Sequence, residues 1–169
     1  MMQACKSPDT AAQIESLEAD FRRLEEAPPD SAARMRQVAM QLAALYEAFA
    51  DERPKDPRTP AYLMKSASHY LMDQANPAKP IEVCDRVIRE FPDSQEAAEA
   101  LFQKAFIYNN TLRNLDQAKT AYEEFLRRYP EHPLSASAES ELATLGMTEE
   151  QLLRRLLGDT LRQEEVPAE

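Results

Sequence analysis

Glycine, cysteine and tryptophan are scarce in this chain of 169 residues, which holds two glycines, two cysteines and no tryptophan. Glycine supplies the positive φ angles of β-turns and of loops that hold phosphate groups, so its scarcity disfavours all-β folds and phosphate-binding loops. Two cysteines are too few for a disulfide framework or a structural zinc site. No apolar run approaches the roughly 20 residues that a membrane-spanning helix needs.

Basic residues are fewer than acidic ones: the chain has 20 basic and 30 acidic residues, and its net charge is −10. An acidic surface repels phosphate backbones, and no stretch of the chain concentrates lysine and arginine with interleaved aromatic residues. Nucleic-acid binding is therefore disfavoured. Solubility, the usual role of a net charge, accounts for the acidic surface.

Residues with high helix propensity, such as alanine, leucine and glutamate, are abundant. Ile14, Leu17, Phe21 and Leu24 recur at helical spacing and form one apolar face. Prolines cluster between such stretches, where they end helices rather than break them. The pattern predicts an all-α protein with helices at about 10–26, 31–52, 60–75, 80–91, 94–111, 115–129, 134–145 and 148–161.

These helices are expected to form one domain with short tails. Gly146 is a natural αL stop for the helix before it, and Thr148 with Gln151 forms the capping box of the last helix. The expected parts are a disordered tail (1–9), one helical-repeat domain (10–163) and a frayed tail (164–169). Within the domain we expect an N-terminal helix pair (10–52), a first repeat (60–92), a second repeat (98–130) and C-terminal helices (134–163).

The chain is similar to itself at one fixed spacing, which we call the repeat step. The pairs that this step matches are Leu63–Leu101, Ala67–Ala105, Tyr70–Tyr108, Val87–Phe125, Phe91–Tyr129 and Pro92–Pro130. The small alanines leave room for a neighbouring helix, and the residue before each proline is pushed out of the α region, which ends the second helix. A fixed period of roughly 38 residues indicates a helical repeat.

The pattern of small alanine, tyrosine, aromatic residue and terminal proline resembles that of tetratricopeptide repeats. The phrases FPDSQEA (91–97) and YPEHPLSASA (129–138) are similar to the subtype of bacterial envelope proteins, including the β-barrel-assembly lipoprotein and the Tol-Pal-associated coordinator. The period is longer than the roughly 34 residues typical of the family. Pro80 also stands where the next repeat has the small Ala118.

The resemblance implies a fold and a role. The fold is a set of antiparallel helix pairs stacked as a short right-handed solenoid with a C-terminal capping helix. The role is that of a non-catalytic scaffold for other proteins or peptides.

A second face of each first helix is the candidate binding surface, because the resemblance implies that this face lines a concave groove. It lies about 100° around the helix from the core face. Its residues are Phe102, Phe106 and Asn109 in the later repeat and Met64, Ser68 and Leu71 in the earlier one. The alternative is that these side chains pack against the next first helix or the C-terminal helix.

Catalysis has little support in the sequence. His69 and His132 are the candidate bases at neutral pH, and the chain has no histidine pair at i, i+4 for a metal and no nucleophile elbow. We therefore expect no enzyme activity, no metal and no cofactor.

Two features bear on location and assembly. Ala4-Cys5 followed by a polar segment looks like the end of a bacterial lipoprotein signal peptide, so we expect lipid on Cys5 and a place on the periplasmic side of the outer membrane. The alternative is a soluble cytosolic adaptor or co-chaperone without a lipid anchor. The leucine-rich last helix, with Leu152, Leu153, Leu156, Leu157 and Leu161, is either a cap on the open face of the last repeat or a surface for self-association.

Overall fold

The computed structural model describes residues 9–73 and 75–164, and in this part of the chain every regular element is helical. Cys5, Leu156 and Leu161, with the two expected tails apart from Asp9 and Glu164, lie outside the described residues or side chains. The elements are α1 (Thr10–Glu25), a short 3₁₀ helix η1 (Pro29–Ser31), α2 (Ala32–Glu52), α3 (Thr59–Tyr70), α4 (Lys79–Glu90), α5 (Gln95–Asn110), α6 (Leu115–Arg128), α7 (Ser135–Thr144) and α8 (Glu149–Glu164).

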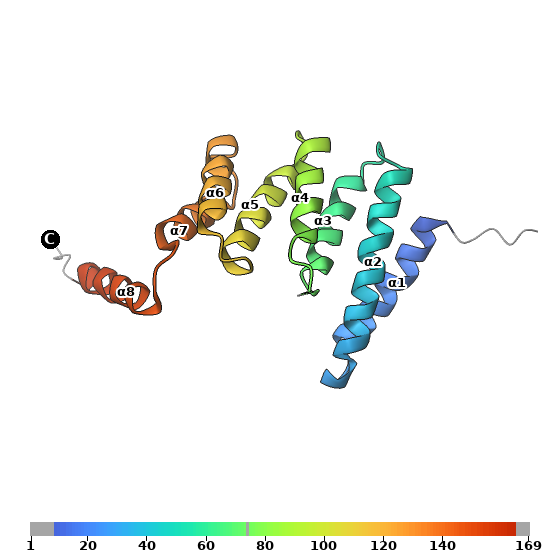
Figure 1. The fold of residues 1–169 in the computed structure, drawn as a ribbon, viewed down its shortest axis with the longest axis horizontal. Helices are drawn as coiled ribbons and strands as arrows, with labels where there is room; N and C mark the ends of the chain where they lie inside the picture. Colours follow the sequence, from blue (N-terminus) through green and yellow to red (C-terminus); the bar gives the residue numbers. More distant parts are fainter. Residues whose placement is uncertain (1–8, 74, 165–169) are drawn as a thin grey trace, which may run out of the picture.

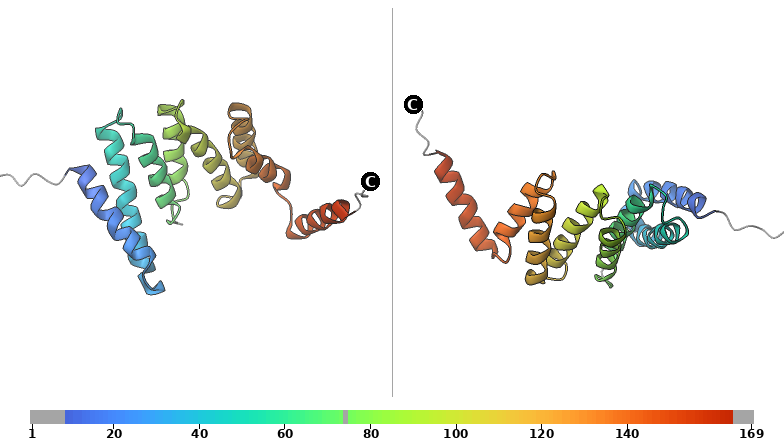
Figure 2. Two further views of the ribbon diagram at one scale, coloured as in Figure 1. Left: turned by 180° about the vertical axis from the view of Figure 1, so that it is seen from behind. Right: turned by 90° about the horizontal axis from the view of Figure 1, so that it is seen from above.

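The helices follow one another in a row along the longest axis of the molecule, from α1 to α8 (Figure 1). Three antiparallel pairs, α1–α2, α3–α4 and α5–α6, lie side by side, and α7 packs against the last of them. The two further views show the same succession of helices (Figure 2). The predicted all-α solenoid is confirmed.

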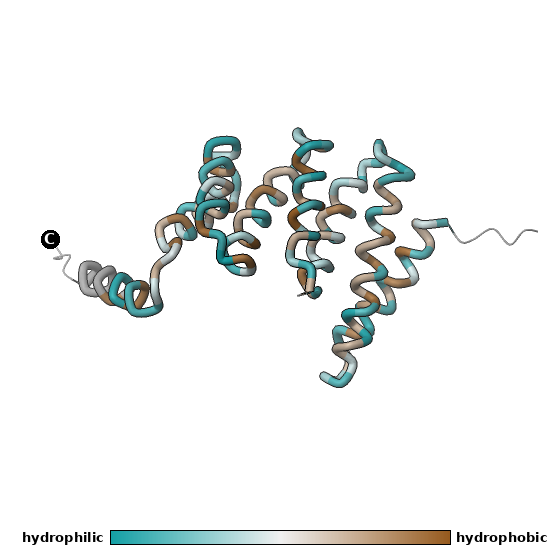
Figure 3. The backbone as a smooth tube through the Cα atoms, viewed as in Figure 1, coloured by the Kyte–Doolittle hydropathy of each residue, from teal (hydrophilic) through white to brown (hydrophobic). Residues whose placement is uncertain are grey.

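Each pair contributes to a cluster of buried side chains in the described part of the chain. The first lies between α1 and α2, the second around α3 and α4, and the third among α5, α6 and α7. Hydrophobic and hydrophilic residues alternate along these helices (Figure 3), as expected when one side of a helix is buried. The buried side chains thus form three clusters in succession along the stack, as expected when each repeat contacts only its neighbours.

The repeat step is confirmed by burial. Leu63 and Leu101 are both buried, and Ala67 and Ala105 are fully buried, as their small size at a helix crossing requires. The inward residues of the second helices are buried as well: Cys84 and Tyr122, and Val87 and Phe125. Pro80 lies in the first turn of α4, where a missing N–H has no cost.

The same step also reaches back into the first pair, which the sequence analysis did not detect. The repeat step leads from Arg53 to Phe91 and from Phe91 to Tyr129, and each of the three precedes a proline and ends the second helix of a pair. Their φ angles are −134°, −131° and −132°, and their ψ angles are 60°, 50° and 55°. The chain therefore contains three equivalent helix ends rather than two.

The turns after these helix ends are also built alike. The backbone N–H of Asp56, Ser94 and His132 donates to the carbonyl oxygen three residues earlier, over 3.1, 3.0 and 3.1 Å. The side chain of each then accepts a hydrogen bond from a backbone N–H two or three residues later. His132, a candidate base in the sequence analysis, is thus occupied in holding a turn.

The predicted end of α3 is wrong by five residues, because the helix stops at Tyr70 rather than near residue 75. The next backbone N–H groups, of Met72 and Asp73, donate to carbonyls three residues back, which tightens the last turn. Asp73 Oδ1 then accepts a hydrogen bond from the N–H of Ala75 at 3.0 Å. This side-chain turn competes with the helix and ends it.

The last helix begins as predicted, and its described leucines stay exposed. Gly146 has a φ of +75°, and Thr148 and Gln151 exchange the two hydrogen bonds of a capping box, at 2.9 and 3.2 Å. Beyond it α8 leaves the stack (Figures 1 and 2), and its described leucines are exposed, Leu153 by 58% and Leu157 by 57%. Arg155 Nη1 on α8 donates to the carbonyl oxygen of Ala143 on α7 at 2.6 Å, so the described contact between the two helices is polar.

Candidate functional site

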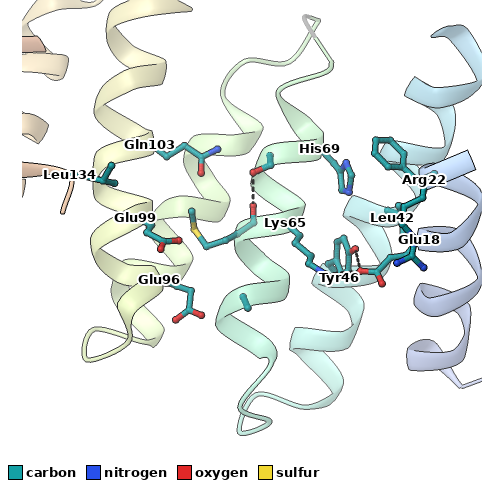
Figure 4. Close-up of a pocket in the computed structure, with 14 residues that line it drawn as sticks. Glu18, Arg22, Leu42, Tyr46, Lys65, His69, Glu96, Glu99, Gln103 and Leu134 are labelled. Carbon is teal, nitrogen blue, oxygen red and sulfur yellow. Dashed lines mark hydrogen bonds and ion pairs between the residues drawn. The ribbon is translucent and has the colours of Figure 1, made fainter. Parts of the chain in front are cut away.

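A groove with a volume of about 730 Å³ runs across the first helices of the three pairs (Figure 4). One wall is α1, the floor is α3 with part of α2, and the other wall is α5 with the start of α7. Its lining residues are Glu18, Phe21, Arg22, Leu42, Tyr46, Ala61, Met64, Lys65, Ser68, His69, Glu96, Glu99, Gln103 and Leu134. We refer to this surface as the groove.

The apolar part of the groove comes from side chains that also belong to the core. Tyr46 and Leu42 are almost fully buried, and Met64 is packed against the α3–α4 cluster. Ala61 and Ser68 are small and lie on the same side of α3 as Met64, which leaves open space above the helix. This apolar area, with open space above it, suits an apolar ligand surface.

Glu18 joins α1 to α2 and α3 at the centre of the groove. Its Oε1 accepts hydrogen bonds from Tyr46 Oη at 2.6 Å and from Lys65 Nζ at 2.7 Å. Burial alone would raise the pKa of Glu18, but these two hydrogen bonds and the charges of Lys65 and Arg22 outweigh it, so the pKa is lowered. Glu18 is therefore ionised, and its two hydrogen bonds give it a structural role in joining the three helices.

His69, on α3, packs its ring against one aromatic ring of α1 and one of α2. The ring centroid is 4.8 Å from that of Phe21, edge to face, and 6.0 Å from that of Tyr46, nearly parallel. Burial, and then the charge of Lys65, lower the pKa of His69, although carboxylates on α1 oppose them. The neutral imidazole of His69, on α3, is thus a packing group at the edge of the floor, where it meets α1 and α2.

The two walls carry charges of opposite sign without ion-pair partners among the described residues. On α1, the exposed Arg22 points toward the groove (Figure 4). On α5, Glu96 and Glu99 line the facing wall, and Glu99 accepts a hydrogen bond from Gln95 at 3.3 Å. A ligand lying across the groove would therefore meet positive charge at one end and negative charge at the other.

The structure separates the six residues of the predicted binding face. Met64 and Ser68 line the groove, whereas the other four are not among its lining residues. Phe102 packs edge to face on Tyr122 and Phe125, with centroids 5.6 Å away in both cases.

The remaining three residues of that face lie elsewhere. Asn109 Nδ2 donates to Glu141 Oε2 on α7 at 3.1 Å, and Leu71 lies in the turn after α3. Phe106 is 43% exposed. Asn109 thus contacts the next first helix, as the packing alternative expects, whereas Phe102 packs on α6, the second helix of its own repeat.

The groove also contains residues that the sequence analysis missed. Glu96, Glu99 and Gln103 recur on α5 at spacings of 3 and 4, one position away from the predicted face. Phe21 and Arg22 could not be found from the repeat, since they lie on α1, which does not follow the repeat step. His69 lies on α3 and was considered only as a candidate base. The available signal was the helical spacing of the three polar residues on α5.

Among residues 9–73 and 75–164, no group of three or more histidine, cysteine, aspartate or glutamate side chains is placed to hold a metal ion. Within that part of the chain, none of the helices combines the length and the apolar character needed to cross a membrane. Cys84 is buried in the core, and this burial raises the pKa of its thiol to about 12.

Residues 99–132, which cover most of α5, all of α6 and the following turn, match the family model described as tetratricopeptide repeat. A search of curated proteins and a search of solved structures found no match. Repeats of this kind stack into solenoids whose extended surfaces bind other proteins, and they are not catalytic. The matched segment contains Glu99 and Gln103 of the groove.

Proposed function

Taking the tetratricopeptide repeat at residues 99–132 as the premise, we propose that the protein is a scaffold that holds a segment of another protein in the groove. One observation carries the proposal: a groove of about 730 Å³ has an apolar area on its floor, beside the Lys65–Glu18 ion pair, and its two walls carry charges of opposite sign that have no ion-pair partner among the described residues. Charged side chains left open beside an apolar surface supply orientation to a ligand that the floor attracts.

The groove favours a ligand with an apolar stripe and opposite charges at its two ends. The stripe would cover Met64 and Ala61, and a basic residue would reach Glu96 or Glu99 on α5. An acidic residue would reach Arg22 on α1. An amphipathic helix has this distribution when its apolar positions recur every three or four residues.

Ser68→Glu is the variant that tests the site. Ser68 is exposed in the groove, and its Oγ donates to the carbonyl of Met64, four residues earlier, at 3.1 Å. Thr120→Glu is the matched control, because Thr120 is exposed on α6 outside the groove and its Oγ1 donates to the carbonyl four residues earlier at 2.9 Å. Both changes place glutamate, a good helix former, on a helix surface.

The probe is a displayed library of helical peptides selected on the wild-type chain. We expect enriched peptides to carry an apolar stripe with a basic end, and to lose at least about tenfold in affinity on Ser68→Glu but not on Thr120→Glu. Circular dichroism of both variants checks that the fold is kept. Enriched peptides that bind Ser68→Glu as tightly as wild type would place the site elsewhere.

We propose, separately, that the protein is a bacterial envelope lipoprotein anchored through Cys5 to the periplasmic side of the outer membrane. The support is the sequence Ala4-Cys5 followed by a polar segment, together with the repeat phrases at 91–97 and 129–138. Buried acyl CH₂ groups would supply the anchoring, at about 0.8 kcal/mol each. The alternative function is that of a soluble cytosolic adaptor with the same groove.

Fractionation of cells that express the gene from its own locus distinguishes the two. An anchored protein partitions with membranes, incorporates a labelled fatty acid, and is released by Cys5→Ser. Cys84→Ser is the control, because that thiol is buried and should carry no lipid. Wild-type protein that stays soluble and unlabelled would support the cytosolic alternative, while leaving the groove proposal unaffected.

A further inference from the structure

The α5 wall of the groove is a single line of residues along one side of the helix. Glu96, Glu99 and Gln103 follow one another at spacings of three and four residues (Figure 4). Phe106 is the next residue in this series, three positions after Gln103, so it lies on the same side of α5. The line therefore begins with two carboxylates and ends, one turn beyond the groove, with an aromatic side chain.

The floor helix α3 shows the same arrangement. Ala61, Met64 and Ser68 line the groove at the same spacings of three and four residues. Leu71 comes three residues later, and its backbone N–H still donates to the carbonyl oxygen of Ala67, at 3.3 Å, so it continues the helical path. The helices α3 and α5 run in the same direction, because each is the first helix of an antiparallel pair (Figures 1 and 4). Both lines thus reach the same end of the groove.

The two residues at that end are apolar and exposed. Leu71 is 39% exposed and Phe106 is 43% exposed. The repeat step matches Phe106 with Ser68, which lines the groove, so the two residues occupy equivalent places on their helices. Phe102, four residues before Phe106, supplies the ring that packs on α6. The ring of Phe106 is therefore open to a ligand, and aromatic residues are enriched where partners bind.

The other end of the α5 line is suited to a basic residue. Glu96 and Glu99 have no ion-pair partner among the described residues, and the hydrogen bond that Glu99 accepts comes from a neutral amide group. Lys65 on the floor is bound to Glu18 of the opposite wall, with its Nζ 2.7 Å from Oε1. The acidic wall therefore keeps its charge for a basic group of the ligand, and that charge favours one orientation.

The α5 line also sets the distance between the two features of the ligand. Glu99 and Phe106 are seven residues apart, or about 10 Å at 1.5 Å per residue. Helices that pack at about 20° run nearly side by side, so a helical ligand brings residues two turns apart opposite residues two turns apart on α5. A helix that crossed α5 steeply would touch one of the two residues and leave the other exposed.

We propose that the binding surface continues over Leu71 and Phe106, and that its ligand is a helical segment with a basic and an apolar residue seven positions apart. The basic residue lies on Glu99, with Glu96 beside it, and the apolar residue lies on Phe106 and Leu71. This inference rests on the proposed function, because it uses the groove as the binding surface. It adds the direction of the ligand, whose basic end runs along α5, and the spacing of the two residues that α5 recognises.

The helical peptides selected on the wild-type chain test the proposal. We expect enriched peptides to pair a lysine or arginine with an aromatic or aliphatic residue seven positions away. Phe106→Ser should lower their affinity at least about tenfold, and Leu71→Ser should lower it as well, because each change removes an apolar contact. Leu153→Ser is the matched control and should bind as the wild type does, since Leu153 is 58% exposed on α8, outside the groove. Melting temperatures check that each variant keeps its fold.

A double-mutant cycle identifies the peptide residue that lies on Phe106. Replacing the apolar residue of the peptide by serine should cost about tenfold in affinity on the wild-type chain and little on Phe106→Ser, where the contact is already lost. Glu99→Arg should also weaken binding, and a peptide with glutamate in place of its basic residue should restore it. Additive losses in the cycle, or no rescue by the glutamate peptide, would overturn the proposal.

Ser68→Glu separates this inference from the proposed function. If binding of the peptides depends on Ser68 but not on Phe106, the groove remains the binding site and this inference alone fails. The same holds if the enriched peptides show no preference for the spacing of seven residues. If binding depends on neither Ser68 nor Phe106, both proposals fail.

Discussion

The helices α6 and α8 have similar lengths and both are amphipathic, yet only α6 belongs to the stack. In α6 the buried residues are two alanines and two aromatic residues, Ala118, Ala121, Tyr122 and Phe125. In α8 the apolar residues are leucines, and those described are exposed. Leucine content alone therefore does not determine which helix is packed.

The difference is one of shape as well as of polarity. Alanine lets a neighbouring helix approach, and an aromatic ring one turn away fills the space beside the contact. At the positions that correspond to Ala121, Tyr122 and Phe125, α8 has Asp159, Thr160 and Gln163. An aspartate buried at a helix crossing would need a partner, so α8 is excluded from the stack even though it is rich in leucine.

The largest expected effect comes from truncating one apolar residue in each helix. Phe125→Ala should destabilise the protein by about 3–5 kcal/mol, because Phe125 is fully buried among Phe102, Tyr129 and His132. Leu153→Ala should change the free energy of unfolding by no more than about 0.5 kcal/mol, as expected for an exposed site. Urea unfolding at a protein concentration where the chain is monomeric measures both, and equal costs would mean that α8 is packed.

The packed repeats were largely predictable, because the repeat step links buried positions on different helices. Leu63, Ala67 and Val87 and their equivalents could be placed from the sequence alone. The first pair could be predicted from the repeat step only in part, because Phe49 and Arg53-Pro54 on α2 follow that step. Nothing on α1 does, so its contribution to the groove depends on how it packs and could not be read from the period.

The next effect in size concerns a helix crossing. Ala105→Leu should overpack the contact between α5 and the neighbouring helices, because Ala105 is a fully buried residue of α5. The free energy of unfolding should fall by about 1–3 kcal/mol. Ala143 is the equivalent position on α7 but is exposed, so Ala143→Leu is a matched control with little expected cost. Melting temperatures of the two variants report the difference. An unchanged melting temperature for Ala105→Leu would contradict its place at a crossing.

The binding face was harder to predict than the core. Phe102 and Gln103 are one residue apart and therefore about 100° apart around α5, and both positions lie beside the core face. The positions of α6 and α7 decide between them: Phe102 packs on the rings of α6 in the cluster that α7 completes, and Gln103 lines the groove. Helical periodicity identifies a face but not the neighbour that will cover it.

A smaller effect separates the two phenylalanines of the predicted face. Phe102→Ser should cost at least the roughly 0.5–1.5 kcal/mol of one edge-to-face ring pair, because Phe102 makes two such contacts. Phe106→Ser should stay near zero, since that ring is exposed. Chemical denaturation of the single variants measures both. A larger loss for Phe106 than for Phe102 would reverse the assignment of packing and surface.

The smallest effect is a pH dependence that arises at the wall of the groove. The pKa of His69 is lowered in the folded protein by burial and by the charge of Lys65, while Glu18 and Glu25 on α1 oppose the shift. The unfolded chain therefore binds a proton more readily, with a pKa of about 6.5. His69 contributes its full stability above that pH, and the contribution is lost as the pH falls toward the folded pKa.

The carboxylates that face His69 can be separated from it by their range of titration. Glu18 has a lowered pKa in the folded protein, so its own contribution is complete above about pH 4.5 and is lost only below that value. Between about pH 7.5 and pH 5.5, stability should therefore fall more in the wild type than in His69→Phe, which keeps a ring against Phe21 but cannot titrate. Urea midpoints at the two pH values give the comparison. Parallel losses in the two proteins would show that His69 takes up its proton as easily in the folded chain as in the unfolded one.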